Sequence, residues 1–186
     1  SDLAHELRTP IATLAIYHEG LFDGVTDLSV ETQAVLTSQT ARLARLADDI
    51  DDVSRAEEGR LSLERAPYLV NDLVLRSVEA SRGRYRDKGV DFSLDLGDSK
   101  DLAVDVDSNR IGQVLGNLLA NSLRHTPAGG HVTVSARPEP HEAVITVADD
   151  GDGIPADQLP HIFERFYRGD TARSRDSSGS GIGLTI

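Results

Sequence analysis

A histidine, a glutamate and a threonine stand close together at the start of the sequence, where they could carry out group transfer. His5 and Thr9 are four residues apart, so a helix would place them on one face, with Glu6 beside the histidine. A neutral imidazole is a good nucleophile near pH 7, and a neighbouring carboxylate can take the proton that leaves it. On an anonymous helix, a merely solvated histidine is the commoner occurrence. Pro10 argues for function, because a proline inside a helix costs about 3 kcal/mol or more.

The residues around this group predict a helical hairpin. Apolar residues recur at steps of four and three from Leu3 to Leu21, and a second apolar run extends from Leu36 to Val53. A short break at residues 24–29 separates the two runs, which indicates antiparallel helices. In this register His5 takes the position furthest from the core, and Glu6 lies nearer the flank. One hairpin leaves its apolar stripe uncovered, so we expect a homodimer that forms a four-helix bundle.

The periodicity changes near residue 60, which predicts a second unit. Residues 61–63, 90–94, 102–104, 131–137 and 143–147 are typical of short strands, and residues 68–84 and 111–123 of helices. Residues 138–141 supply a turn between the last two strands. Mainly antiparallel strands mixed with helices favour an α+β layer with its helices on one face. We therefore expect a helical hairpin over residues 1–60 and an α/β sandwich over residues 61–186.

Three polar clusters in the second unit could bind a nucleotide. Asn117 and Asn121 lie one helical turn apart, and amide groups suit both Mg²⁺ and phosphate oxygens. Two buried amides bonded to the backbone are the plainer alternative. Residues 149–153 (Asp-Asp-Gly-Asp-Gly) follow a predicted strand, where a carboxylate could accept hydrogen bonds from an exocyclic amine. Their spacing does not fit a calcium loop of the EF-hand type.

The third cluster is a glycine-rich run at residues 177–184. Such a run is most often a flexible loop, and this one lacks the lysine of a phosphate-binding P-loop. A helix that began near Gly183 would attract phosphate through its free N–H groups and its dipole.

Residues 5–10 (His-Glu-Leu-Arg-Thr-Pro) resemble the H box of bacterial sensor histidine kinases. The three clusters are similar to the N box and the two glycine boxes of that family's ATP-binding domain, and residues 163–168 resemble its F box. The five motifs follow the family's order and cover nearly the whole chain. The resemblance implies that ATP phosphorylates His5 and that the phosphoryl group passes to an aspartate on the receiver domain of a response regulator. It also implies that Glu6 is the general base, and that Thr9 orients water when the regulator is dephosphorylated.

The same resemblance implies the residues of an ATP site. Asn121 would hold Mg²⁺, with Asn117 and Arg124 near the phosphates. Asp149 would recognise the adenine amine. Two glycines, at 151 and 153, would let the backbone close around the base, and the three at 179, 181 and 183 would form the edge of a lid over the phosphates. The full set of implied ATP-binding residues is Asn117, Asn121, Arg124, His125, Asp149, Gly151, Gly153, Ile154, Phe163, Phe166, Arg168, Gly179, Gly181, Gly183 and Leu184.

Composition excludes several classes of protein. The net charge of −12 argues against nucleic-acid binding and against docking on an anionic membrane surface. The absence of cysteine excludes disulfides and thiolate chemistry. No apolar run reaches the ~18 residues that span a bilayer, so we expect this piece to be soluble and cytoplasmic. With the family resemblance, we also expect it to come from a longer protein that is anchored in the cell membrane. The family's ATP-binding domain continues beyond the second glycine box, so we also expect its last helix and strands to lie past residue 186.

Two other functions remain open at this point. The hairpin could be a scaffold that dimerises and docks a regulator while the ATP-binding domain is inactive. The chain could instead be an ATPase of the related chaperone and topoisomerase group, although that group has no H box.

Overall fold

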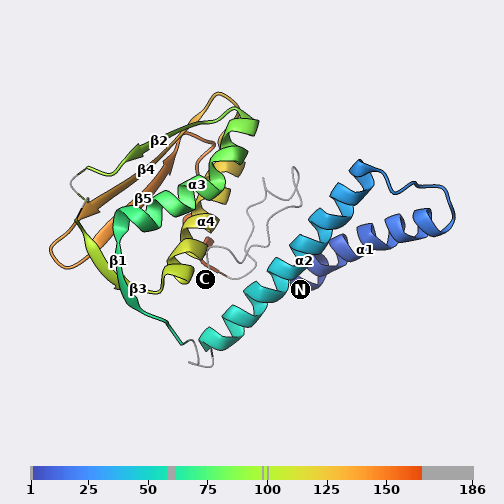
Figure 1. The fold of residues 1–186 in the computed structure, drawn as a ribbon, viewed down its shortest axis with the longest axis horizontal. Helices are drawn as coiled ribbons and strands as arrows, with labels where there is room; N and C mark the ends of the chain where they lie inside the picture. The colour runs from blue at the N-terminus through green and yellow to red at the C-terminus, as the bar shows by residue number, and fades with distance from the viewer. Residues whose placement is uncertain (1, 58–61, 98, 100, 165–186) are drawn as a thin grey trace. The chain divides into compact units, whose positions relative to one another are not determined.

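The computed structural model describes residues 2–57, 62–97, 99 and 101–164, which belong to two compact units (Figure 1). The N-terminal helices form one unit, and residues Ser62–His161 form the other. Each unit has its own contacts and is described by itself.

The helical unit is a hairpin of α1 (Asp2–Phe22) and α2 (Val30–Glu57). The backbone N–H groups of Val25 and Thr26 both donate to the Gly20 carbonyl, which ends α1 and turns the chain. Ser29 caps α2 by accepting the N–H of Thr32 at 3.1 Å. The two helices contact each other along the hairpin, as the apolar spacing predicts.

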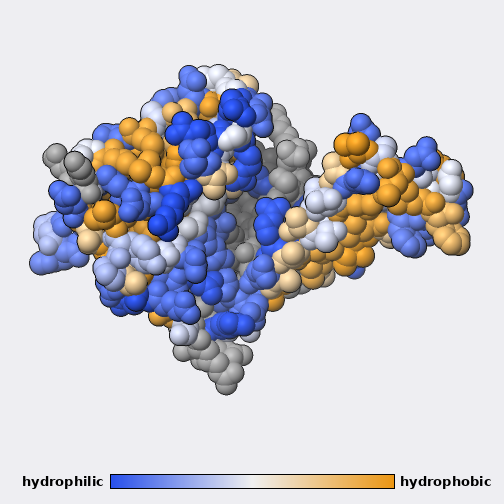
Figure 2. Space-filling view, in the orientation of Figure 1, coloured by the Kyte–Doolittle hydropathy of each residue, from blue (hydrophilic) through white to orange (hydrophobic). Residues whose placement is uncertain are grey.

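Pro10 lies inside α1 without ending it, and its ring is buried. Large apolar side chains nevertheless stay on the surface, and Figure 2 shows hydrophobic surface along the hairpin. The exposed ones are Ile11, Ile16, Phe22, Val25, Leu28 and Val30. An apolar face of this kind is typical of a surface that a partner covers.

The α/β unit contains a three-stranded sheet and a two-stranded sheet. Strand β4 (His131–Pro138) lies between β2 (Asp91–Asp95), which is parallel to it, and β5 (Ala143–Asp149), which is antiparallel. Strand β1 (Ala66–Leu69) pairs antiparallel with β3 (Ala103–Val106). Helices α3 (Val70–Lys88) and α4 (Ser108–His125) contact each other and cover the three-stranded sheet (Figure 1). A short 3₁₀ turn follows at Leu159–His161.

The core lies between these two helices and the sheet. Val132, Val134 and Ala136 alternate along β4 and are all buried, because every second residue of a strand faces the same side. Tyr85 of α3 is 1% exposed and donates its hydroxyl to the Leu119 carbonyl of α4 at 2.8 Å. Burial, assisted by the charge of Asp149, raises the pKa of Tyr85 to about 12. The tyrosine therefore stays a neutral donor throughout the ordinary pH range and ties the two helices together.

Most of the predicted elements are confirmed, and one region is wrong. The predicted strands at 90–94, 102–104, 131–137 and 143–147 correspond to β2, β3, β4 and β5. Residues 62–65 form no strand, whereas Ala66–Leu69 do, so Tyr68 lies in β1 and not in the helix that follows. The reason is tertiary, since β1 forms by pairing with β3, whose paired residues are 34 to 40 positions further along the chain.

Replacement of Tyr85 by Phe tests the contact between α3 and α4. We expect Tyr85→Phe to lower the free energy of unfolding by about 1 kcal/mol, the usual net worth of one hydrogen bond. Urea denaturation followed by circular dichroism measures the change. Tyr68→Phe, at a partly exposed position on β1, is the control. Equal losses in both variants would contradict the assignment.

Candidate functional site

The predicted phosphoacceptor group lies in the first turns of α1. The side chain of His5 is exposed, as the heptad position predicts. The Thr9 hydroxyl lies one turn further along and donates to the His5 carbonyl at 3.2 Å. Threonine hydroxyls in helices commonly make this bond to the residue four positions back, and it holds the hydroxyl beside the histidine backbone.

Glu6 lies in a different environment from the one the sequence predicts. Its side chain is not on the flank but within the hairpin, with only 4% of the residue exposed. A guanidinium nitrogen (Nη2) of Arg42 on α2 lies 2.8 Å from Glu6 Oε2. A buried carboxylate needs such a partner, because an unpaired charge is costly to desolvate. Two adjacent residues of α1 thus face solvent and interior respectively.

Helix α4 carries the predicted asparagines and is held at both ends. At its start, Asp107 Oδ1 accepts the backbone N–H groups of Asn109 and Arg110 at 3.0 and 3.2 Å. At its end, Lys88 Nζ donates to the carbonyls of Leu123 and Arg124 at 2.6 and 3.1 Å. A cation at this end also interacts favourably with the negative pole of the helix dipole.

The polar residues predicted for the ATP site stand along this helix. Asn117, Asn121 and Arg124 are partly buried, so none of them is a deeply enclosed core amide. Their spacing of three and four residues places them on neighbouring turns. The helix therefore presents amide and guanidinium groups together, which can contact phosphate oxygens or a hard cation.

The loop that follows β5 packs against the end of α4. At Gly151 a side chain would have no room, since a Cβ would lie 2.5 Å from the carbonyl oxygen of His125. The Gly151 N–H donates to Asp149 Oδ1 at 3.1 Å, and Gly153 adopts a left-handed conformation with φ of 68°. Glycine at 151 is thus required by a contact within the protein, in addition to any approach to a ligand. This contact joins two of the predicted clusters, which lie 24 residues or more apart in the sequence.

His125 lies where these clusters meet. Partial desolvation of its ring and the charge of Arg124 lower the pKa of His125, and the carboxylates of Asp149 and Asp152 oppose this only in part. Because the ordinary pKa of histidine is about 6.5, the imidazole is neutral at pH 7. A neutral ring can stack on an aromatic base without bringing a positive charge to it.

The remaining predicted residues are not part of this arrangement as described. Ile154 and Phe163 are exposed, at 49% and 67%. Phe166, Arg168, Gly179, Gly181, Gly183 and Leu184 lie outside the described residues.

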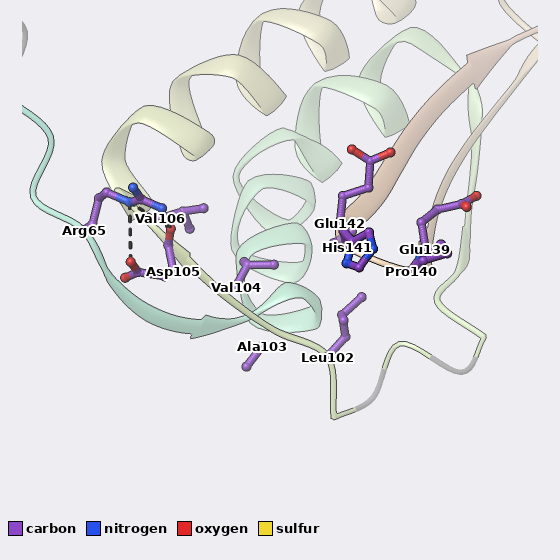
Figure 3. A pocket seen from close by; sticks show the side chains of 11 residues that line it. Arg65, Leu102, Ala103, Val104, Asp105, Val106, Glu139, Pro140, His141 and Glu142 are labelled. Atoms are coloured by element: carbon purple, nitrogen blue, oxygen red, sulfur yellow. Dashed lines mark hydrogen bonds and ion pairs between the residues drawn. The ribbon is translucent and has the colours of Figure 1, made fainter.

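A groove of about 560 Å³ lies elsewhere on the α/β unit (Figure 3). It is lined by Arg65, residues 102–106 of the β3 region and residues 139–143 of the turn between β4 and β5. None of the predicted site residues lines this groove. The candidate nucleotide site is therefore the surface at the end of α4 and β5, and not this groove.

Sequence reasoning did not identify Arg42 or Lys88. Both contact site elements that are distant in sequence, by 36 residues in the pair with Glu6 and by 35 and 36 in the contacts of Lys88. A signal for Arg42 was available, since an antiparallel hairpin brings the early turns of α1 opposite the middle of α2. No local pattern points to Lys88.

Among the described residues, no helix is both long and apolar enough to cross a membrane, and no three histidine or acidic side chains are grouped so that they could hold a metal ion.

Two family models match the chain. Residues 1–59 match the His Kinase A (phospho-acceptor) domain, and residues 106–186 match the histidine kinase-, DNA gyrase B- and HSP90-like ATPase domain. The first match includes α1 and α2, and the second begins at the end of β3 and includes α4 and β5.

Individual proteins agree with these matches. The signal transduction histidine-protein kinase BaeS of Escherichia coli is 39% identical over 186 residues, which are 100% of this chain and 39% of BaeS. The structure of the histidine kinase AdeS of Acinetobacter baumannii has a TM-score of 0.78 and 28% identity, and covers 97% of this chain and 83% of that one. The histidine kinase ThkA in complex with the response regulator protein TrrA has a TM-score of 0.70 and 25% identity, over 89% of this chain and 48% of that one. The chain thus spans well under half the length of BaeS. It belongs to the sensor histidine kinases, and it joins a phosphoacceptor helical hairpin to an ATP-binding α/β domain.

Proposed function

We propose that this chain is the catalytic core of a histidine kinase that transfers the γ-phosphoryl group of ATP to His5 and then to an aspartate of a response regulator. The observation that supports this most directly is the exposed His5 on α1, in a chain that also carries the paired α4 and β5 clusters. An exposed histidine can be reached first by a nucleotide and then by a second protein. A buried one could not serve two partners in turn.

ATP would bind at the end of α4 and β5. Asp149 would accept a hydrogen bond from the adenine amine, and the neutral ring of His125 would stack on the base. Asn117 and Arg124 would contact the phosphates. Phosphoryl transfer needs little covalent chemistry from the protein, so positioning and charge neutralisation by these groups would supply most of the catalysis.

Mg²⁺ fits this site as a companion of the nucleotide. The described residues offer no cluster of three carboxylates or histidines, so a metal ion here would take most of its ligands from phosphate oxygens and water. The partly buried Asn121 would add one amide oxygen, a ligand that suits a hard cation. When bound, the ion would neutralise charge on the transferring phosphoryl group.

Glu6 would act as the general base for His5, and its pair with Arg42 sets a condition for this role. The carboxylate is 2.8 Å from the guanidinium and buried, whereas the imidazole is exposed. To take the histidine proton, Glu6 would have to exchange Arg42 for His5 or share itself between the two. We infer that the hairpin as described is a resting arrangement of this pair.

Two partners would bind the helical hairpin, a second copy of the chain and a response regulator. The exposed apolar residues of the hairpin would pack against a second copy, which gives a homodimeric four-helix bundle. The face with His5 and Thr9 would dock the receiver domain of the regulator, and the ThkA–TrrA complex is a precedent in a similar kinase. We assign residues 1–60 to dimerisation and phosphotransfer and residues 61–186 to ATP binding, in a parent protein anchored in the cell membrane.

The first test concerns the phosphoacceptor. His5→Gln should abolish labelling by γ-labelled ATP, because the imidazole of His5 is the proposed phosphoacceptor. Helix α1 also carries an exposed histidine beside a glutamate at His18 and Glu19, so His18→Gln is the control and should keep the label. In the unsubstituted protein the label should be acid-labile and base-stable, as phosphohistidine is. Nucleotide binding and dimerisation should be unchanged, because an exposed side chain supports no core. Undiminished labelling would contradict the proposal, and a protein that binds the regulator without any labelling would favour a scaffold.

The second test concerns the metal. Asn121→Ala should weaken binding of ATP with Mg²⁺ far more than it lowers thermal stability, because the site loses one ligand and α4 keeps its packing. Calorimetric titration, with and without Mg²⁺ (removed with EDTA), measures the difference. If affinity is unchanged in both conditions, Asn121 is a structural amide.

The third test separates two activities on one helix face. Thr9→Ala should leave autophosphorylation within a few-fold but strongly reduce dephosphorylation of the regulator, because the hydroxyl would hold the attacking water. Glu6→Gln should do the reverse and lower autophosphorylation by about 10²-fold, the usual worth of a positioned base. Both rates are measured on the same preparations with the cognate regulator. Equal loss of both rates in Thr9→Ala would indicate a structural role for the hydroxyl.

A further inference from the structure

The first residues of the α/β unit, which follow the helical unit in the chain, are tied to the start of helix α4 by the carboxylate of Asp107. We call residues 62–65 the described linker, since they follow the helical unit and precede β1. The backbone N–H of Glu64 donates to Asp107 Oδ2 at 3.0 Å, across 43 residues of sequence. The same side chain, through Oδ1, caps α4 by accepting the N–H groups of Asn109 and Arg110.

The cap does not require this second contact. One side-chain oxygen is enough to cap a helix, and serine or asparagine caps about as well as aspartate. Here Oδ1 takes both helix N–H groups, which leaves Oδ2 for Glu64. The carboxylate therefore does two things, one local to the helix and one directed at the linker.

The next residue strengthens this attachment. Arg65 donates through Nε and Nη2 to the backbone carbonyl of Asp105, at 3.1 and 3.0 Å. Its Nε also lies 3.5 Å from Asp105 Oδ2, and Figure 3 shows this side chain crossing from the linker to the end of β3. The pairing of β1 with β3 begins immediately afterwards, at Ala66 and Val106. The last two residues of the described linker, Glu64 and Arg65, are thus fixed to the junction between β3 and α4.

We propose that Asp107 is a positioning residue for phosphoryl transfer, because it fixes the point where the linker leaves the α/β unit to the helix that carries the nucleotide-binding residues. This inference rests on the proposed function. His5 lies on the helical unit and the nucleotide residues on the other, so the linker sets how the γ-phosphate is presented to the imidazole. Without the bond to Asp107, the tether lengthens, and each freed residue adds about 3.3–3.6 Å of reach. ATP affinity does not depend on this tether, whereas the rate of transfer does.

The hydrogen bond from the Glu64 N–H to Asp107, which we call the clamp, persists over a wide pH range. Hydrogen bonds from the backbone N–H groups of Arg110, Glu64 and Asn109 lower the pKa of Asp107. A carboxylate with a lowered pKa stabilises the fold above its ordinary pKa, and that contribution is lost only as the pH falls through the lowered value. The clamp is therefore fully formed at neutral pH.

Asp107→Ser is the informative variant. Serine keeps the helix cap, but its single hydroxyl oxygen cannot at the same time accept the N–H of Glu64. We expect the amide of Glu64 to exchange faster with solvent, measured by NMR, while the KM for ATP stays within twofold. Circular dichroism should show that the variant remains folded at the assay temperature. The kcat of His5 labelling should fall by about tenfold or more, since misplacing reacting groups by about 1 Å can cost 10²-fold. Glu79→Ser, which removes only an exposed ion pair with Arg82 on α3, is the control and should change none of these values.

Glu64→Pro removes the same hydrogen bond from the other side, because proline has no N–H. It should lower kcat as Asp107→Ser does, and the double variant should be no worse than either single one, as expected for two groups of one interaction. Unchanged exchange of the Glu64 amide in Asp107→Ser would overturn the clamp. Faster exchange with normal kcat, or a parallel loss of ATP affinity, would overturn its role in positioning. Absence of His5 labelling in the unsubstituted full-length protein would instead count against the proposed function.

Discussion

The position of helix α4 depends on hydrogen bonds that take up its free backbone groups at both ends. Asp107 accepts the first N–H groups, and Lys88 donates to carbonyls of the last turn. Such terminal groups have no partner within a helix, so whatever binds them also fixes where the helix stands. Tyr85 adds a third attachment in the middle, at Leu119. The side chains that we propose to bind the nucleotide therefore stand on a helix that is held at both ends and in its middle.

This rigidity extends to the loop after β5 through a contact that only glycine allows. The backbone at Gly151 lies against the carbonyl of His125, and Asp150 Oδ1 accepts the N–H of His131 at 2.7 Å. The acidic loop is thus held both to the end of α4 and to the start of β4. Asp149, at the end of β5, lies close enough to His125 for its charge to act on the imidazole. Such preorganisation reduces the entropy that ligand binding would otherwise cost.

In the helical unit, two adjacent residues of α1 lie in opposite environments, one exposed and one buried. Successive residues of an α-helix point about 100° apart, so one can face solvent while the next faces the partner helix. His5 is accessible for this reason, and Glu6 is buried against Arg42. A buried pair of this kind adds little net stability, because desolvation offsets much of the attraction. It nevertheless holds the Glu6 carboxylate in one place, against Arg42 of α2.

The sequence by itself determined the hairpin, the five motifs and most of the strands, because each of these depends on local periodicity or on residue types at short spacing. It predicted that His5 is exposed, since the heptad fixes that side chain relative to its own helix. The tertiary structure decided the rest. Glu6 proved buried because Arg42 approaches from α2, and β1 formed at residues 66–69 because β3 pairs with it. The second contact of Asp107 and the need for glycine at 151 were likewise invisible, because both arise from backbone groups 24 or more residues away. Local patterns fix which face of an element is polar, whereas only the packed chain decides which distant group meets that face.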